Sequence, residues 1–417
     1  MERFVISKKI QILIIIIVTF LTYANILQNY FVWDDIDFIP WAASKDLSSA
    51  KNFIMGEVPQ GHFGVYRPVR SFIYVASYDL WKNNPIGYHF QSILVHLIAT
   101  ILVYFIVFEI TNKSALAFMS SLVFGVHPVH TEAITSITAS FDVFGVIFFL
   151  ASFYLYIKAT PEKNYLYFAS VIFAVLSFFT YEFALTLPLL IVLHDLCFKK
   201  TASLFKKVKV YAPYFAGVFL YFFIRFFVLE ISNRGAYFAG SFYHTMLIMA
   251  KAFLKYILLL IFPVNLSVNH SVSKGILSYA YIDLNEKIVL AQSIFDFNIL
   301  LSIVVIMFLV IIALLSFKKY PIVSFCIGWF FIALAPVSNI LPQSVIMSEK
   351  YLYIASFGFT LLFSFIVYTL YTSFDAKYLK IGLILFLVFV LIFYSATTLE
   401  RNKDWKDQFT LWTKTVQ

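Results

Sequence analysis

A group of acidic residues follows the first apolar segment of the chain, in "FVWDDIDFIP" at 31–40. Asp34 and Asp35 are adjacent carboxylates that could take a proton from a hydroxyl group, which is the role of a general base. A carboxylate near a sugar ring also stabilises a transition state with oxocarbenium character. Asp37 is expected to be structural. The alternative for all three residues is an ordinary solvated cap at the end of a helix.

Basic residues in three other polar segments could supply the second half of this chemistry. Transfer of a sugar from a lipid phosphate to a hydroxyl needs cations or hydrogen-bond donors that stabilise the departing phosphate. Arginine suits this role because its planar guanidinium can donate two hydrogen bonds at once. Arg67 and Arg70 could instead extend to lipid headgroups. The candidates for binding a donor phosphate are Arg67, Arg70, Arg234 and Lys350.

The elements that must position these groups are apolar helices. Of 417 residues, 61% are hydrophobic and 13% are charged, whereas a soluble domain has about 25% charged residues. Apolar runs of about 20 residues recur, enough to cross ~30 Å of hydrocarbon as helices, and we predict an all-α polytopic membrane protein.

The net charge of +9 gathers in short loops, which indicates membrane orientation and not nucleic-acid binding. Cys197 and Cys326 fall in predicted spans and form neither a disulfide framework nor a metal cluster.

We predict about eleven transmembrane helices in a membrane domain at 1–398, with a long first outer loop at 29–85. That loop contains short amphipathic pieces at about 45–56 and 67–81. The segment 243–262 is expected to be interfacial or re-entrant, because a span there would put Lys251 and Lys255 at membrane depth. The tail 399–417 would then lie on the outer face. The predicted spans are about 8–28, 86–110, 115–128, 135–157, 165–181, 183–198, 210–229, 297–316, 321–338, 351–372 and 379–397.

The conspicuous polar segments all map to the predicted outer face, whereas the inner loops are short and merely basic. A channel or carrier would be expected to place polar groups near the midplane. "HPVHTE" at 127–132 contains metal-ligand residue types, but its spacing differs from standard zinc motifs. We therefore expect no metal site, a helix cap is the alternative role, and dependence on a divalent ion stays open. Further pocket candidates on this face are His127, His130, Glu182, His270 and Glu349.

Taken in order, nine motifs resemble the membrane part of the transmembrane and tetratricopeptide-repeat (TMTC) O-mannosyltransferases and their prokaryotic relatives. The resemblance covers about 30–412 and implies a GT-C glycosyltransferase fold. It also implies a catalytic acid in the first outer loop and a polyprenyl-phosphate sugar donor. The motifs are "FVWDD", "YRPVRSF", "NPIGYHFQSILVHL", "VFGVHPVHTEAI", "YEFALTLP", "LLLIFPVNLSV", "PVSNILP", "SEKYLYIASFGF" and "RNKDWKDQFTLW".

The resemblance carries family positions onto individual residues. The acidic pair falls on Asp34 and Asp35, and the Arg-Pro of the first loop on Arg67 and Pro68. The His-Thr-Glu ends at Glu132, which joins the catalytic candidates, and the Glu before Tyr-Leu-Tyr falls on Glu349. The chain departs from the family at Asn269, where relatives often have an acidic residue, and at Gln417, where tandem repeats would begin.

These observations predict an inverting hexosyltransferase, with mannose implied by the resemblance. The sugar would pass from a polyprenyl- or dolichyl-phosphate carrier to a protein Ser or Thr. One alternative is a GT-C transferase that acts on a lipid or an extracellular glycan. The other is a transporter or flippase of lipid-linked sugars. The protein would lie in the plasma membrane of a prokaryote or in the endoplasmic reticulum of a eukaryote, with its site on the outer or lumenal face.

Overall fold

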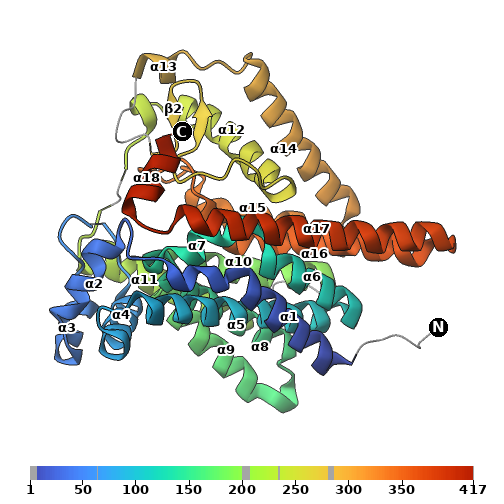
Figure 1. Cartoon of the computed structure of the whole chain (residues 1–417), viewed down its shortest axis with the longest axis horizontal. Helices are drawn as coiled ribbons and strands as arrows, with labels where there is room; N and C mark the ends of the chain where they lie inside the picture. The colour runs from blue at the N-terminus through green and yellow to red at the C-terminus, as the bar shows by residue number, and fades with distance from the viewer. Residues whose placement is uncertain (1–6, 63, 200–206, 233–234, 280–285, 417) are drawn as a thin grey trace.

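The computed structural model describes residues 7–62, 64–199, 207–232, 235–279 and 286–416. The fold is helical apart from one small antiparallel hairpin, formed by β1 (Ser271–Ser273) and β2 (Ile276–Leu277). Figure 1 shows long helices that run side by side along the longest axis of the molecule. The prediction of an all-α polytopic membrane protein is confirmed.

Eight of the described helices are long and apolar enough to cross a membrane, so the chain is an integral multi-pass membrane protein. Within the bundle, α5 packs against α6 and α8, and α16 packs against α15 and α6. The eight segments are Lys8–Gln28 (α1 and a 3-10 turn), Pro85–Thr111 (α5), Ile137–Lys158 (α8), Val208–Val228 (α11 and a π-helical turn), Phe242–Ile261 (α12), Phe297–Ser316 (α14), Glu349–Ser373 (a 3-10 turn and α16) and Lys377–Asp404 (α17).

Four of the eleven predicted spans are shorter helices than a full crossing needs. Proline accounts for several of their ends, because it lacks the amide hydrogen that continues a helix and fits best in the first turn. Pro128 follows the end of one of them, and Pro188 and Pro321 lie in the first turns of two others. The short helices are α6 (Ser114–Val126), α9 (Asn164–Phe178), α10 (Leu187–Phe198) and α15 (Pro321–Leu334).

The segment predicted to be interfacial or re-entrant forms one uninterrupted helix, α12, with the length and composition of a span. The chain beyond α12 nevertheless turns back along it. Lys255 Nζ donates to the carbonyl of Ser271 at 2.9 Å, and Lys251 Nζ donates to Ser273 Oγ at 2.9 Å. These contacts join α12 to the hairpin that follows it and are compatible with a segment that does not cross. The membrane position of α12 stays a prediction.

Short elements gather at the end of the bundle where α1 finishes and α17 ends (Figure 1). We call this the Asp34 end. It includes the predicted short pieces of the first loop, since a helix covers 50–54 and another covers 68–81. The elements at the Asp34 end are α2 (Asp35–Ala43), α3 (Ala50–Ile54), α4 (Pro68–Trp81), α7 (Thr131–Thr135), the β1–β2 hairpin, α13 (Glu286–Leu290) and α18 (Gln408–Val416).

Candidate functional site

A cavity of about 530 Å³ lies at the Asp34 end. Its walls come from segments that are far apart in the chain, between residues 33 and 405. Four carboxylates and four Arg or Lys side chains line it among the described residues. Six of these eight belong to the predicted site: Asp34, Arg67, Arg70, Glu132, Glu182 and Lys350; the other two are Asp142 and Arg225.

Asp34 reaches the cavity from the turn that precedes α2. Its side chain is partly exposed and makes no hydrogen bond or ion pair with any residue that the structure describes. The preceding residue, Trp33, has a φ of +53°, a left-handed conformation that is unusual for a bulky side chain. The Asp34 carboxylate therefore faces the cavity without a hydrogen-bonded partner, within the electrostatic reach of Lys350, and it stands on a strained turn.

Asp35 does not line the cavity and is fully buried. Its carboxylate accepts hydrogen bonds from the backbone amides of Thr138, at 2.7 Å, and Val32, at 3.1 Å. Burial raises the pKa of Asp35 to about 6, although these hydrogen bonds favour the charged form. Asp35 therefore ties α2 to α8 and lies outside the cavity lining, and its role as a possible base stays a prediction.

The raised pKa of Asp35 predicts a pH dependence of stability. A carboxyl group whose pKa is higher in the folded protein contributes stability below its unfolded pKa, and this contribution is lost as the pH rises through the folded value. The wild type should thus lose up to about 3 kcal/mol of this contribution between pH 4 and pH 7.5, since each pKa unit is worth about 1.4 kcal/mol. Thermal unfolding in detergent measures it. Asp35→Asn should be less stable overall and lack this slope, and an unchanged slope in the variant would contradict the prediction.

Three arginines and two carboxylates form a network on one wall of the cavity. Asp142 accepts from Arg67, at 2.7 Å, and from Arg70, at 2.6 Å. Glu182 pairs with Arg67, and its Oε1 lies 4.0 Å from Arg225 Nη1. The network joins α4, α8 and the end of α11 to the turn at 182. Its excess of guanidinium groups suits this wall to an anionic ligand.

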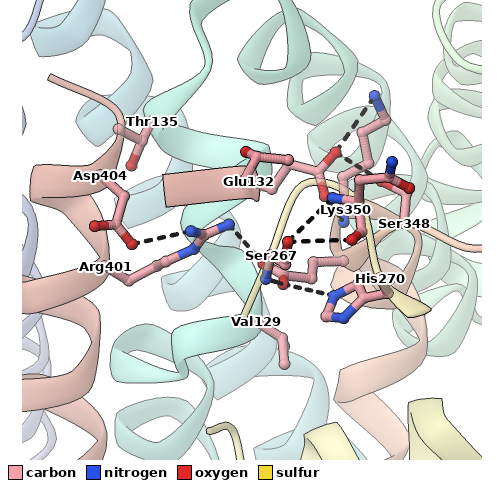
Figure 2. Close-up of polar contacts among 12 residues, drawn as sticks. Val129, Glu132, Thr135, Ser267, His270, Ser348, Lys350, Arg401 and Asp404 are labelled. Atoms are coloured by element: carbon pink, nitrogen blue, oxygen red, sulfur yellow. Dashed lines mark hydrogen bonds and ion pairs between the residues drawn. The ribbon is translucent and has the colours of Figure 1, made fainter. Parts of the chain in front are cut away.

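Glu132 and Lys350 meet on another side of the cavity (Figure 2). Lys350 Nζ lies 3.5 Å from Glu132 Oε1 and 5.5 Å from the centre of the Trp33 ring. Glu132 also accepts from Ser348 Oγ, at 2.6 Å, and from the Lys350 amide, at 3.2 Å. Because both oxygens of Glu132 are occupied, Glu132 is arranged to hold Lys350 in place, and its catalytic role stays a prediction.

Glu349 and His270, two further pocket candidates, do not line the cavity. Glu349 is fully buried and accepts from His270 Nε2, at 2.8 Å, and from the Ser267 amide, at 2.6 Å (Figure 2). Asn269, the departure from the family, accepts from Ser278 Oγ and from the Tyr279 amide. These residues support the loop that carries Tyr279 into the cavity wall.

His127 and His130 are buried in the bundle and do not line the cavity either. His127 Nε2 bonds to the carbonyl of Leu260 at 3.0 Å, and His130 Nε2 bonds to Ser356 Oγ at 2.8 Å. Both rings face inward because Pro128 ends α6 and turns the chain before α7. Across the described ranges, no group of three or more His, Cys, Asp or Glu side chains is arranged to hold a metal ion. Arg234, the remaining predicted cation, lies outside the described residues.

Prediction from the sequence missed Asp142, Arg225 and the aromatic wall formed by Trp33, Tyr279 and Trp405. The sequence does contain a signal for Asp142 and Arg225. Asp142 and Arg225 fall inside predicted spans, where an ionisable residue is costly unless it faces a partner or a functional cavity. A π-helical turn at Ile224–Val228 carries Arg225, and such turns occur frequently at functional sites.

Comparisons with known proteins point to one group of relatives. No protein-family model matches the chain. A protein O-mannosyl-transferase of Caenorhabditis elegans is 28% identical over 430 residues, covering 96% of this chain and 57% of the relative. Human TMTC3 is 31% identical over 100 residues, covering 24% of this chain and 11% of the relative. The resemblance to the TMTC O-mannosyltransferases is confirmed over nearly the whole chain, although the chain spans only about half the length of the worm protein.

Among solved structures, the chain is similar to the crystal structure of ArnT from Cupriavidus metallidurans bound to undecaprenyl phosphate. The TM-score is 0.46 and the identity is 11%, with 98% of this chain and 77% of that chain covered.

Proposed function

We propose that this chain, which is similar to the TMTC O-mannosyltransferases over nearly all of its length, is a glycosyltransferase of the GT-C class. Its donor would be a hexose, by resemblance mannose, on a polyprenyl or dolichyl phosphate. Its acceptor would be a Ser or Thr hydroxyl of a protein at the outer or lumenal face. The observation that supports this most is the single cavity that joins an unpaired carboxylate, Asp34, to a wall of cations.

The proposed step is a single displacement with inversion at the sugar. Asp34 accepts the proton of the acceptor hydroxyl while that oxygen forms a bond to the anomeric carbon. The bond from the anomeric carbon to the phosphate oxygen breaks, and its electron pair leaves on the carrier phosphate. Lys350 and the guanidinium groups of Arg67 and Arg70 offset the charge that develops there, which lowers the barrier electrostatically. Asp34 also stabilises the oxocarbenium character of the sugar.

Lys350 is the cation best suited to the leaving phosphate, because it lies beside Trp33, the residue before Asp34. Lys350→Met should lower kcat/KM for the donor by about a hundredfold, as removal of one stabilising donor does in other enzymes. Lys403→Met, at an exposed position on α17, is the matched control and should leave kcat/KM unchanged. Steady-state kinetics over a range of donor concentrations measures both. Equal kinetics for the two variants would remove Lys350 from the proposed role.

The function is tested by incubating the purified protein in detergent or nanodiscs with a panel of polyprenyl-phosphate sugars. Peptides rich in Ser and Thr, lipids and glycans serve as acceptors in parallel, and each reaction runs with EDTA and with added Mg²⁺ or Mn²⁺. Glycopeptide formation from one donor is the expected result. If sugar is transferred only to lipid or glycan, the acceptor is not a protein. Sugar transport without turnover would show a transporter and not an enzyme.

A further inference from the structure

The segment that follows the apolar part of α17 contacts both sides of the reaction centre. Gln408, at the start of α18, bonds to Trp33, and Arg401, near the end of α17, pairs with Glu349. Trp33 directly precedes Asp34, and Glu349 directly precedes Lys350. Asp34 and Lys350 both line the cavity. We propose that Arg401 and Gln408 form a brace that sets the separation between the Asp34 carboxylate and the Lys350 ammonium group. The inference rests on the proposed function, in which these two groups act on opposite ends of one transfer.

On the Asp34 side, the brace holds a strained turn. The Trp33 amide donates to Gln408 Oε1 at 2.8 Å. The Trp33 ring stacks on Trp405 at 6.4 Å and 22°, and it meets the Trp412 ring edge-on at 5.7 Å. A left-handed conformation in a bulky residue persists only when its surroundings enforce it. The φ of +53° at Trp33 therefore depends on these contacts, and the direction of the Asp34 side chain depends on that φ.

On the Lys350 side, the brace is a buried ion pair between Arg401 and Glu349. Arg401 Nη2 lies 3.8 Å from Glu349 Oε2, and Arg401 Nη1 donates to Asp404 Oδ2 at 3.0 Å (Figure 2). Within the described ranges, neither Glu349 Oε2 nor Arg401 Nη2 has a hydrogen-bond partner, so each of these buried atoms faces the opposite charge of the other. The pair fixes the turn at Glu349–Tyr351 from which the Lys350 side chain leaves for the cavity.

The brace is itself anchored to the membrane bundle through Asn402. The Asn402 side chain donates to the carbonyl of Thr22 at 3.1 Å and accepts from Thr135 Oγ1 at 3.1 Å. The backbone carbonyl of Asn402 accepts from Asn29 Nδ2 at 3.0 Å. Because Asn402 is fully buried, α17 cannot shift at this point without breaking several hydrogen bonds. The two contacts of the brace therefore position Asp34 and Lys350 relative to the same anchored end of α17.

Gln408 allows a clean test because it is exposed, so its replacement does not threaten folding. Gln408→Leu removes the acceptor for the Trp33 amide at nearly constant size, whereas Gln408→Glu keeps it. Lys414→Ala, also exposed on α18, is the control. The expected result is a fall in kcat of about tenfold or more for Gln408→Leu, since small misplacements of reacting groups are costly. The donor KM and the unfolding temperature should be unchanged, and Gln408→Glu should retain the wild-type kcat.

A second readout does not depend on activity. Hydrogen exchange at the Trp33 amide, followed by mass spectrometry on peptides that cover 30–36, should accelerate in Gln408→Leu and stay slow in the other two variants. Wild-type turnover and slow exchange in Gln408→Leu would overturn the brace. A wild type that turns over no donor would overturn the proposed function, while the exchange data would still decide whether Gln408 holds the Trp33 turn.

Discussion

Asp34→Asn is expected to lower the rate of sugar transfer by about 10²–10⁴-fold, the contribution of a well-placed general base. The substitution keeps the size of the side chain and removes its capacity to accept the hydroxyl proton. Since the Asp34 side chain makes no hydrogen bond or ion pair within the described part of the chain, the protein should fold and bind the donor as before. Turnover and donor binding are measured on the same preparation.

Asp79→Asn is the matched control for this substitution. Asp79 lies on α4 in the same outer loop and is exposed, with Lys82 as its partner at 3.1 Å. It should retain wild-type turnover. If Asp34→Asn also retains turnover, the base is another group. If it loses turnover only together with donor binding, Asp34 contributes to binding and not to proton transfer.

Asp142→Asn should be the most damaging substitution for stability. It leaves Arg67 and Arg70 on one wall without the carboxylate they share. Breaking a buried ion pair on one side costs about 3–5 kcal/mol, because an uncompensated charge remains in a poorly solvated place. Donor turnover should fall as well, since both guanidinium groups lose their fixed positions. Thermal unfolding and steady-state kinetics in detergent measure the two effects.

A second substitution separates the charge effect from simple loss of packing. In Asp142→Asn combined with Arg70→Gln, the arginine that has lost its carboxylate partner is removed while Arg67 keeps Glu182, and part of the lost stability should return. Effects within one ion-pair network are not additive, so the double variant should be more stable than the sum of the single variants predicts. A double variant with fully additive losses would contradict the network as described.

The acidic pair shows how far the sequence can identify a site. The motif places two carboxylates at the start of the first outer loop, and the structure shows that only one of them faces the cavity. Consecutive residues in a helical turn point about 100° apart, so one side chain of such a pair turns inward when the other turns outward. Which of the two does so depends on packing against Thr138, which is 103 residues away.

The network of arginines and carboxylates on the cavity wall is predicted only in part from the sequence. Arg67, Arg70 and Glu182 lie in polar segments and were identified from residue type alone. Their partners Asp142 and Arg225 lie within apolar helices, where a search limited to loops does not find them. The pairing of Arg67 with Asp142 and Glu182 also joins three segments that no periodicity connects.

The C-terminal tail carries a motif that the sequence analysis identifies, but its contribution to the cavity is not predicted. The sequence predicts that 399–417, which contains "RNKDWKDQFTLW", is a tail on the outer face where tandem repeats would begin. In the structure, Trp405 lines the cavity, and Asn402, Trp405 and Gln408 contact the turn before Asp34 or the helix that leads to it. Contacts between residues more than 370 positions apart follow from the packing of α1 against α17, which the hydrophobic pattern of either helix does not specify.

The most direct measurement of the central claim is the anomeric configuration of the sugar that the wild-type protein transfers from a polyprenyl-phosphate hexose of known configuration. Purified protein, donor and a Ser/Thr peptide are incubated, and the glycopeptide is analysed by NMR. The single displacement with Asp34 as base predicts a product of inverted configuration that is absent with Asp34→Asn. A product of retained configuration, or an equal yield from Asp34→Asn, would contradict the proposed mechanism.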